Sequence, residues 1–204
     1  MRADITLFYH INGLTERYPP LDAVMVATTT YAPACYALLL VGCWIIWRQR
    51  WQRAAALAGG SALMALGVGQ LVGMVLPRQR PYEVLSHVHV LLAHAPDTSF
   101  PSDHAILVGA VTVGLWALSR RIDVLLVVAG LAVLVGRVYI GVHYPSDVIG
   151  GVLLGGLVAA AVRHLATHAG APALTFAFDR LRRLRLAAAP TLSEAPASSD
   201  RTRG

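Results

Sequence analysis

The sequence predicts an all-α integral membrane protein, a helical bundle of about five to six transmembrane helices with an interfacial helix at its N-terminus. Three observations support this fold class. The chain of 204 residues is 56% hydrophobic and only 14% charged, and its mean hydropathy of +0.58 is far above that of soluble domains. Its long apolar runs are apolar on all sides, as helices in lipid are. Its basic residues fall in short clusters between these runs.

The first element is an interfacial segment over residues 1–20. Within it, the stretch DITLFYHINGLTERY (4–18) places Ile5, Phe8 and Ile11 on one side of a helix, a pattern typical of helices that lie on a membrane surface. The apolar run that follows is too long for the hydrophobic part of a signal peptide. We therefore expect no cleavable signal peptide.

A transmembrane domain is expected over residues 21–165. Spanning requires about 20 apolar residues, with a range of about 17 to 25. Five runs approach or meet that length: 23–47, 54–76, 104–118, 124–142 and 148–162. The third and fifth reach it only with an added turn, from Pro101 and through Leu165 respectively. In the fifth, Gly151 and Gly155 have the spacing that favours close helix packing.

Two segments follow the membrane domain. Residues 166–188 include LTFAFDRLRRLRL (174–186), where an apolar stripe lies opposite four arginines, which predicts a basic amphipathic helix on the anionic cytoplasmic lipid surface. Residues 189–204 are rich in Pro, Ala and Ser, a composition typical of a disordered tail.

The arginines predict the orientation of the bundle. All 17 basic residues are Arg. Three arginines lie in residues 48–53, two at 120 and 121, and seven from Arg163 onward, whereas residues 143–147 have none. Because basic loops stay in the cytoplasm, these arginine-rich segments are predicted to be cytoplasmic and the loops 77–103 and 143–147 to face outward. Arg78 and Arg80 in the outward loop break this pattern and need another explanation.

Two other interpretations of the composition are disfavoured. The net charge of +6 could indicate nucleic-acid binding, but the arginines occur where membrane topology places them, so no nucleic-acid partner is expected. Cys35 and Cys43 lie eight residues apart in one run, which is about 12 Å along a helix and too far for a disulfide.

The outward ends of the runs contain the residues that could perform chemistry. Arg137 lies six residues before His143, so it is about 9 Å below the end of its helix, where a charge is costly in lipid. Its guanidinium either reaches the surface along its own side chain or binds an anion at the mouth of the bundle. The second interpretation is favoured.

The stretch HYPSD (143–147) contains a candidate pair. Pro145 is suited to the first turn of a helix, so His143 ends the loop and Asp147 lies in the first helical turn. The Asp147 carboxylate could hold one imidazole nitrogen and leave the other as a nucleophile or base. The alternative is an ordinary loop histidine beside an acid that favours the helix N-terminus.

The stretch SFPSDHA (99–105) is the third block. Pro101 is predicted to start a helix whose N-terminal amides could bind an anion. Ser102 and Asp103 have an alternative role in helix capping, whereas His104 has no such structural reason to be there. Arg80, extended because Pro81 follows it, and Arg78 would complete a phosphate site.

A metal site is the alternative for the remaining histidines. His87, His89 and His94 could join Asp97 around a zinc ion, but their spacing matches no closed structural pattern. We therefore favour a polar surface role for them and expect no metal and no cofactor.

Taken together, the three blocks resemble those of the type-2 phosphatidic acid phosphatase superfamily of membrane lipid phosphatases. They are Arg80-Pro81, then Pro101-Ser102-Asp103-His104, then Arg137 with His143 and Asp147. The stretches INGLTERYPPLD (11–22) and HAPDTSFPSDHA (94–105) resemble the bacitracin-resistance branch, the undecaprenyl-diphosphate phosphatases. The chain departs from the wider family at Gly73, where a Lys is usual, at Gly136, where a Ser is usual, and at Asp103, where a Gly is usual.

The resemblance implies an enzyme that needs no metal and acts on a polyprenyl diphosphate in the bacterial inner (plasma) membrane, with its site facing the periplasm or outside. His143 would be the nucleophile, oriented by Asp147, and His104 the acid and base. Arg80, Arg137 and Ser102 would bind the phosphate, with Arg78 as a possible clamp for a second phosphate.

Three alternatives stay open. The substrate could be another lipid phosphate, such as phosphatidylglycerol phosphate or phosphatidic acid. The protein could instead bind anionic lipid without hydrolysing it, or have a purely structural role in the membrane. The sequence does not predict the oligomeric state. Asp103, an acid beside a phosphate, is expected either to cap its helix or to pair with an arginine such as Arg78.

Overall fold

The computed structural model describes residues 2–45, 49–92 and 97–168, and every regular element in this part of the chain is a helix. The helices are α1 (Arg2–Asn12), α2 (Pro19–Ile45), α3 (Gln49–Val75), α4 (Pro81–Val84), α5 (Asp103–Leu115), α6 (Arg120–Tyr139) and α7 (Pro145–His168). Residues 1–164 form one compact unit and residues 165–204 a second. The predicted all-α class is confirmed.

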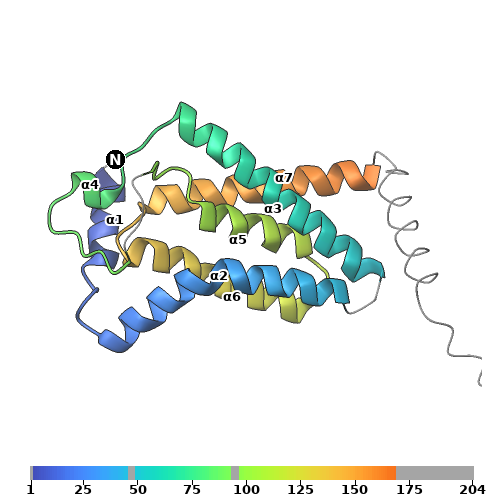
Figure 1. Ribbon diagram of the computed structural model, residues 1–204, viewed down its shortest axis with the longest axis horizontal. Coiled ribbons are helices and arrows are strands. Elements are labelled where there is room, and N and C mark those ends of the chain that lie inside the picture. The colour runs from blue at the N-terminus through green and yellow to red at the C-terminus, as the bar shows by residue number, and fades with distance from the viewer. Residues whose placement is uncertain (1, 46–48, 93–96, 169–204) are drawn as a thin grey trace, which may run out of the picture. The chain divides into compact units, whose positions relative to one another are not determined.

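Four of the helices are long and apolar enough to cross a membrane, namely α2, α3, α6 and α7. Within the first unit they run alongside one another (Figure 1). Large apolar side chains point outward from all four, for example Leu38, Leu63, Val128 and Leu157. Soluble proteins rarely expose so much apolar surface to water, so these faces are suited to lipid. The chain is therefore a multi-pass membrane protein.

Helix α5 differs from its predicted length. It has 13 residues, about 20 Å, whereas a bilayer core is about 30 Å thick. It contacts α2, α3 and α6, lies among the long helices in Figure 1, and has buried residues on every side. Because the other helices shield it from lipid, α5 does not need to reach both membrane surfaces.

Glycines allow α5 and α7 to approach closely. A Cβ atom at Gly155 would collide with the carbonyl oxygen of Ile106, and one at Gly151 would lie 2.7 Å from the Cβ of Ala105. A Cβ at Gly109 would collide with the carbonyl oxygen of Val152. The close packing predicted from the spacing of Gly151 and Gly155 is confirmed.

The two loops predicted to face outward lie at one end of the bundle. Residues 76–102 connect the end of α3 to the start of α5, and residues 140–144 connect α6 to α7. The short helix α4 and the N-terminal helix α1 lie at the same end (Figure 1). The polar residues of both loops are therefore brought together there, as the alternation of the runs predicts.

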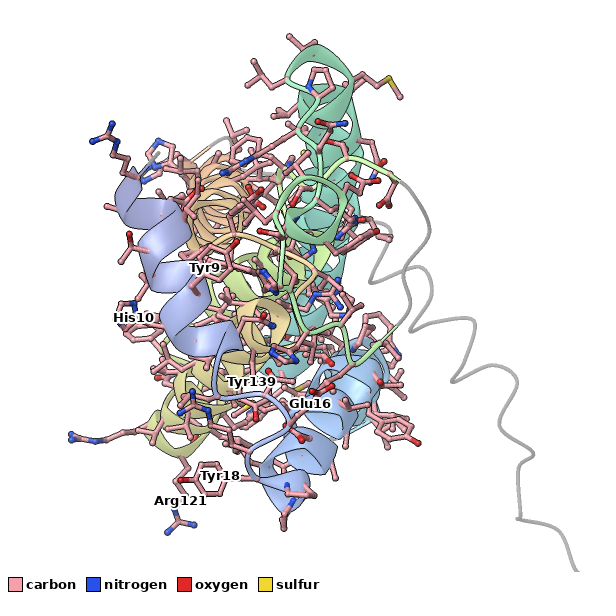
Figure 2. All side chains as sticks on the ribbon, turned by 90° about the vertical axis from the view of Figure 1, so that its left-hand side faces the viewer. Tyr9, His10, Glu16, Tyr18, Arg121 and Tyr139 are labelled. Atoms are coloured by element: carbon pink, nitrogen blue, oxygen red, sulfur yellow. The ribbon has the colours of Figure 1, made fainter. Side chains whose placement is uncertain are left out.

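Helix α1 packs against this end of the bundle through the apolar side predicted from the sequence. Phe8 is fully buried beside Tyr144, with ring centroids 5.8 Å apart. The Tyr9 hydroxyl donates to the Ser86 carbonyl oxygen, and Asn12 bonds both to His89 and to the carbonyl oxygen of Tyr139. Figure 2 looks onto α1, with Tyr9 on the side toward the other helices and His10 on the opposite side. Contact between α1 and the membrane surface stays a prediction.

The C-terminal predictions fall mostly outside the described residues. Of the basic segment 166–188, only residues 166–168 are described, and they are the end of α7. The segment 189–204 lies wholly outside.

Candidate active site

A small polar cavity opens between the ends of the helices. Its volume is about 110 Å³, far more than the roughly 10 to 15 Å³ that one water requires. It is lined by Gly69, Gln70, Arg80, Asp97, Thr98, Pro101, Asp103, His104, Arg137 and His143. Four of the predicted site residues are among these, namely Arg80, His104, Arg137 and His143.

Arg80 reaches the cavity because of the proline after it. Pro81 begins α4 and holds Arg80 extended, at φ −71° and ψ 154°, as predicted. The side chain is nearly fully buried. Its Nε donates to Asp97 at 2.8 Å, and its Nη1 donates to the Val142 carbonyl oxygen at 2.9 Å. These bonds fix the guanidinium against the loop that contains His143.

Arg137 lies in the last turn of α6 and is only 2% exposed. It therefore does not extend to the surface, as the alternative interpretation requires. Its Nη2 lies 3.1 Å from His143 Nε2, and its Nε has no hydrogen-bond partner. Among the residues that the structure describes, no carboxylate lies within ion-pair distance of it. A buried cation without a counter-ion is costly, so this site is suited to an anion.

The hydrogen bonds of His143 determine its protonation. Nδ1 lies 2.8 Å from the carbonyl oxygen of Ser99, which can only accept, so Nδ1 carries a proton. Nε2 faces Nη2 of Arg137 and, at 3.3 Å, Nη1 of Arg80, which can only donate, so Nε2 offers its lone pair. Burial, with the two cations, lowers the pKa of His143 to about 4, although Asp147 opposes the shift. His143 is thus neutral, and it lines the cavity with the lone pair of Nε2 toward the two arginines.

Asp147 lies in the first turn of α7, as predicted, and is fully buried. Its Oδ2 is 3.9 Å from His143 Nδ1, too far for a hydrogen bond. The direct bond expected between the two is therefore absent, and the Ser99 carbonyl takes that place. Asp147 instead accepts from the Ser99 hydroxyl at 2.6 Å and from the Tyr144 backbone amide at 2.9 Å.

The third block lies at the start of α5, where Ser102 is the N-cap, two residues before His104. Its hydroxyl makes no capping bond and is buried without a hydrogen-bond partner. The capping alternative for Ser102 is therefore not realised. His104 lines the cavity, and its Nε2 lies 3.1 Å from the Thr29 carbonyl oxygen on α2, so Nε2 carries a proton.

Asp103 lines the cavity but has a partner that the sequence did not predict. Both carboxylate oxygens lie 3.2 Å from Nε2 of Gln70 on α3. It neither pairs with Arg78 nor serves as the cap of α5, a position that Ser102 occupies. The expectation for Asp103 was therefore wrong, because the side-chain amide of Gln70 on α3 occupies the position next to its carboxylate.

Arg78 is not among the residues that line the cavity. Its guanidinium contacts Asp4, Ser146 and Asp147 and lies over the ring of Tyr144. Its partners therefore differ from those of Arg80 and Arg137, which line the cavity.

The two glycines at the positions where the family has Lys and Ser lie in tight helix contacts. A Cβ at Gly73 would lie 2.6 Å from Thr98 Cγ2, and one at Gly136 would lie 2.8 Å from Thr29 Cγ2. Neither site has room for a longer side chain unless its neighbour moves. The absence of the two family side chains is therefore built into the helix contacts.

Of the histidines considered for zinc, His87 and His89 are not among the residues that line the cavity. His89 Nδ1 pairs with Glu16 at 2.9 Å, and His94 lies outside the described residues. Within the ranges that the structure describes, no group of three His, Cys, Asp or Glu side chains could hold a metal.

Four residues at or behind the site were not predicted: Asp4, Gln70, Asp97 as a partner of Arg80, and Ser99. Gln70 offered a signal, because it is a polar residue within the apolar run 54–76. Asp97 lies two residues before the block SFPSDHA (99–105), and Ser99 is the first residue of that block. Asp4 lies 74 residues from Arg78 in sequence, and no local pattern connects the two.

Comparison with known proteins identifies the family and the fold. The family model described as the PAP2 superfamily matches residues 54–171. Undecaprenyl-diphosphatase BcrC of Bacillus subtilis is 34% identical over 72% of this chain and 76% of its own length. Decaprenylphosphoryl-5-phosphoribose phosphatase of Mycobacterium tuberculosis is 35% identical over 79% of this chain and 89% of its own. The crystal structure of Aquifex aeolicus LpxE superposes with a TM-score of 0.69 at 21% identity, over 78% of this chain and 94% of that one.

Proposed function

The chain belongs to the PAP2 superfamily, and on that premise we propose that it is an integral membrane phosphatase that hydrolyses undecaprenyl diphosphate to undecaprenyl phosphate and inorganic phosphate. Such a reaction recycles the lipid carrier used in cell-wall synthesis and confers resistance to bacitracin. The main support for the substrate is the similarity to undecaprenyl-diphosphatase BcrC.

The observation that carries the proposed activity is the meeting of two buried guanidinium groups at one imidazole nitrogen. Arg80 and Arg137 are each 2% exposed, and both approach His143 Nε2 within 3.3 Å. Two like charges held together in a buried place are stabilised when an anion binds between them. A terminal phosphate bound there would bring its phosphorus to the nucleophilic nitrogen.

Phosphoryl transfer then needs in-line attack and charge stabilisation more than elaborate covalent chemistry. Nε2 of His143 forms a bond to the terminal phosphorus, and the bond from that phosphorus to the bridging oxygen breaks. Undecaprenyl phosphate leaves with the electron pair. Water then attacks the phosphohistidine, which releases inorganic phosphate and restores His143.

Further groups have supporting roles in this scheme. His104, in its doubly protonated form, gives a proton to the departing oxygen and afterwards takes one from the attacking water. Arg80, Arg137, the unpartnered hydroxyl of Ser102 and the N-terminal amides of α5 stabilise the equatorial oxygens. Asp147 keeps His143 in its reactive orientation.

The distribution of arginines supports a location in the bacterial inner membrane with the cavity facing the periplasm or outside. The cavity lies at the end of the bundle opposite the starts of α3 and α6, which contain Arg50, Arg53, Arg120 and Arg121. Because basic loops stay in the cytoplasm, the cavity is on the other side.

The decisive experiment measures phosphate release by detergent-purified protein from undecaprenyl diphosphate, undecaprenyl phosphate, phosphatidic acid and phosphatidylglycerol phosphate side by side, with and without EDTA. We expect the diphosphate to give the highest kcat/KM and EDTA to have no effect, because the arginines supply the positive charge. His143→Gln should reduce release to background, since it removes the nucleophile.

Each alternative has its own result in this assay. A higher kcat/KM for phosphatidylglycerol phosphate or phosphatidic acid would replace the proposed substrate but keep the chemistry. Wild-type turnover by His143→Gln would overturn the mechanism. Binding of the lipids without any release would make the protein a carrier, and loss of activity in EDTA that zinc restores would revive a metal site.

A further inference from the structure

Arg78, in the loop between α3 and α4, contacts the helix α1, the loop 140–144 and the first turn of α7. Its Nη1 donates to Asp147 Oδ1 and to Ser146 Oγ, both at 2.6 Å. Its Nη2 donates to Asp4 Oδ2 at 2.8 Å, and the guanidinium lies 3.9 Å from the centre of the Tyr144 ring. These bonds use three of the five N–H donors of the guanidinium, so Arg78 is held by protein partners behind Asp147.

The contact with Arg78 stabilises a buried charge. Asp147 is completely buried, and Arg78 is its arginine partner at ion-pair distance. A buried carboxylate that loses its cation is strongly destabilised. The geometry of the groups that bond to Asp147 therefore depends on Arg78.

Those groups lead directly to the nucleophile. Oδ2 of Asp147 accepts from the Ser99 hydroxyl, and the Ser99 carbonyl oxygen accepts from His143 Nδ1. Ser99 is fully buried, so water does not compete for either bond. The acid therefore acts on the imidazole through Ser99, whose side chain faces Asp147 and whose carbonyl faces His143.

Asp4 on α1 is the second carboxylate that binds Arg78. On α1, its Oδ2 accepts from Arg78 and from the Ser146 hydroxyl at 2.7 Å, and its Oδ1 accepts from the Ser146 amide at 2.9 Å. Burial opposes these bonds, but together they lower the pKa of Asp4. The buried ring of Phe8 and the bond from Tyr9 to Ser86 hold α1 in place, so Asp4 is a fixed point for Arg78.

We propose that Asp4, Arg78 and Ser99 are positioning residues that, through Asp147, hold His143 in its Nδ1-protonated form with Nε2 directed at the cavity. Through Asp4, the N-terminal helix α1 thereby contributes to the position of the nucleophile. This inference rests on the proposed phosphatase function.

The kinetic test compares Asp4→Asn, Arg78→Gln and Ser99→Ala with the wild type on undecaprenyl diphosphate and on the best monophosphate substrate. Since a misplacement of about 1 Å can cost about 10²-fold in rate, we expect Arg78→Gln to lower kcat by that order and the other two by about 10-fold. KM should change little, and both substrates should be affected equally.

Two further variants test the connection between these residues. Asp4→Asn combined with Arg78→Gln should be no slower than Arg78→Gln alone, because both changes break one chain of contacts. Arg78→Lys should recover part of the rate, since it keeps the charge but not the planar fork that bonds two carboxylates. Arg17→Gln is the matched control, an exposed arginine with no side-chain partner among the described residues, and should behave as the wild type.

A readout without substrate separates this inference from the proposed function. In ¹⁵N-histidine-labelled protein, the His143 signals are those lost in His143→Gln. We expect them to show the Nδ1-protonated tautomer in the wild type and a mixture of tautomers in Ser99→Ala and Arg78→Gln, whichever lipid phosphate is the substrate.

Three results would overturn the inference. The first is Asp4→Asn with wild-type kcat and an unchanged tautomer. The second is a rise in KM for the diphosphate alone in Arg78→Gln, which would make Arg78 a clamp for the second phosphate. The third is that the variants change the thermal midpoint but none of them changes kcat or the tautomer of His143. The contacts would then be purely structural.

Discussion

At the residue scale, the protonation of His143 is the feature on which the chemistry depends. The imidazole is nearly fully buried, and two cations lie beside its Nε2. Both conditions disfavour a third positive charge on the ring. The same arginines that would bind the phosphate therefore keep the nucleophile unprotonated until the anion arrives.

This arrangement predicts the pH dependence of the reaction. Because burial and the two arginines lower the pKa of His143 from 6.5 to about 4, the ring stays neutral at pH values well below its ordinary titration. The acid limb of kcat/KM, which reports the free enzyme, should therefore lie near pH 4, with activity lost as the pH falls through that value.

The measurement is a pH profile of kcat/KM for undecaprenyl diphosphate, with Arg137→Gln as the comparison. Removing Arg137 takes away one cause of the shift, so the acid limb should move toward neutral pH while the plateau falls by about 10² to 10³. A wild-type limb near 6.5, or no movement in the variant, would contradict the assignment of the nucleophile.

The residues of the site divide into those with a local signal and those without one. Arg80, Ser102, His104 and Arg137 each stand beside a proline or within an apolar run, where their charge or polarity needs a reason, and His143 directly follows the apolar run 124–142. Ser99 contributes a backbone carbonyl to the imidazole, and a backbone group has no sequence signature. Its role emerges only when the loop is folded.

At the element scale, the short helix α5 holds the site. Its first turn contains His104, with Ser102 as its N-cap. Its close glycine contacts with α7 hold this turn at a defined position along α7. Because the long helices surround it, α5 can begin below the membrane surface. A phosphate bound at its N-terminus would be partly shielded from water, which strengthens the interactions with the arginines.

A substitution in this contact should affect both stability and activity. Gly155→Ala places a methyl group against the Ile106 carbonyl oxygen, and such overpacking costs about 1 to 3 kcal/mol. We expect a lower thermal unfolding midpoint in detergent and a reduced rate, since α5 must shift. Gly60→Ala, in an open part of α3 where a Cβ meets nothing within 4 Å, is the control and should be neutral or slightly stabilising. Equal midpoints for the two variants would show that the α5–α7 contact is looser than described.

At the scale of the whole molecule, the alternation of the helices brings the chemistry to one end. The loops 76–102 and 140–144 and the helix α1 meet there, while the starts of α3 and α6, with Arg50, Arg53, Arg120 and Arg121, lie at the other end (Figure 1). The same charge distribution that orients the protein in the membrane thus also predicts on which side hydrolysis occurs.

Cysteine labelling tests this orientation. In a variant with Cys35 and Cys43 replaced by Ala, Ser86→Cys and Arg121→Cys each introduce one thiol at an exposed position at opposite ends of the bundle. In intact spheroplasts, a membrane-impermeant maleimide should label Ser86→Cys, and it should label Arg121→Cys only after permeabilisation. The reverse pattern would place the cavity in the cytoplasm.

The sequence by itself determined the fold class, the membrane location and four of the residues that line the cavity, namely Arg80, His104, Arg137 and His143, because hydropathy, prolines and isolated charges are local properties of the chain. Only the tertiary structure decided the short span of α5, the partner of Asp103, and the path from Asp4 through Arg78 and Ser99 to His143. These depend on which side chains meet across long stretches of sequence, and the residues next to one partner do not identify the other.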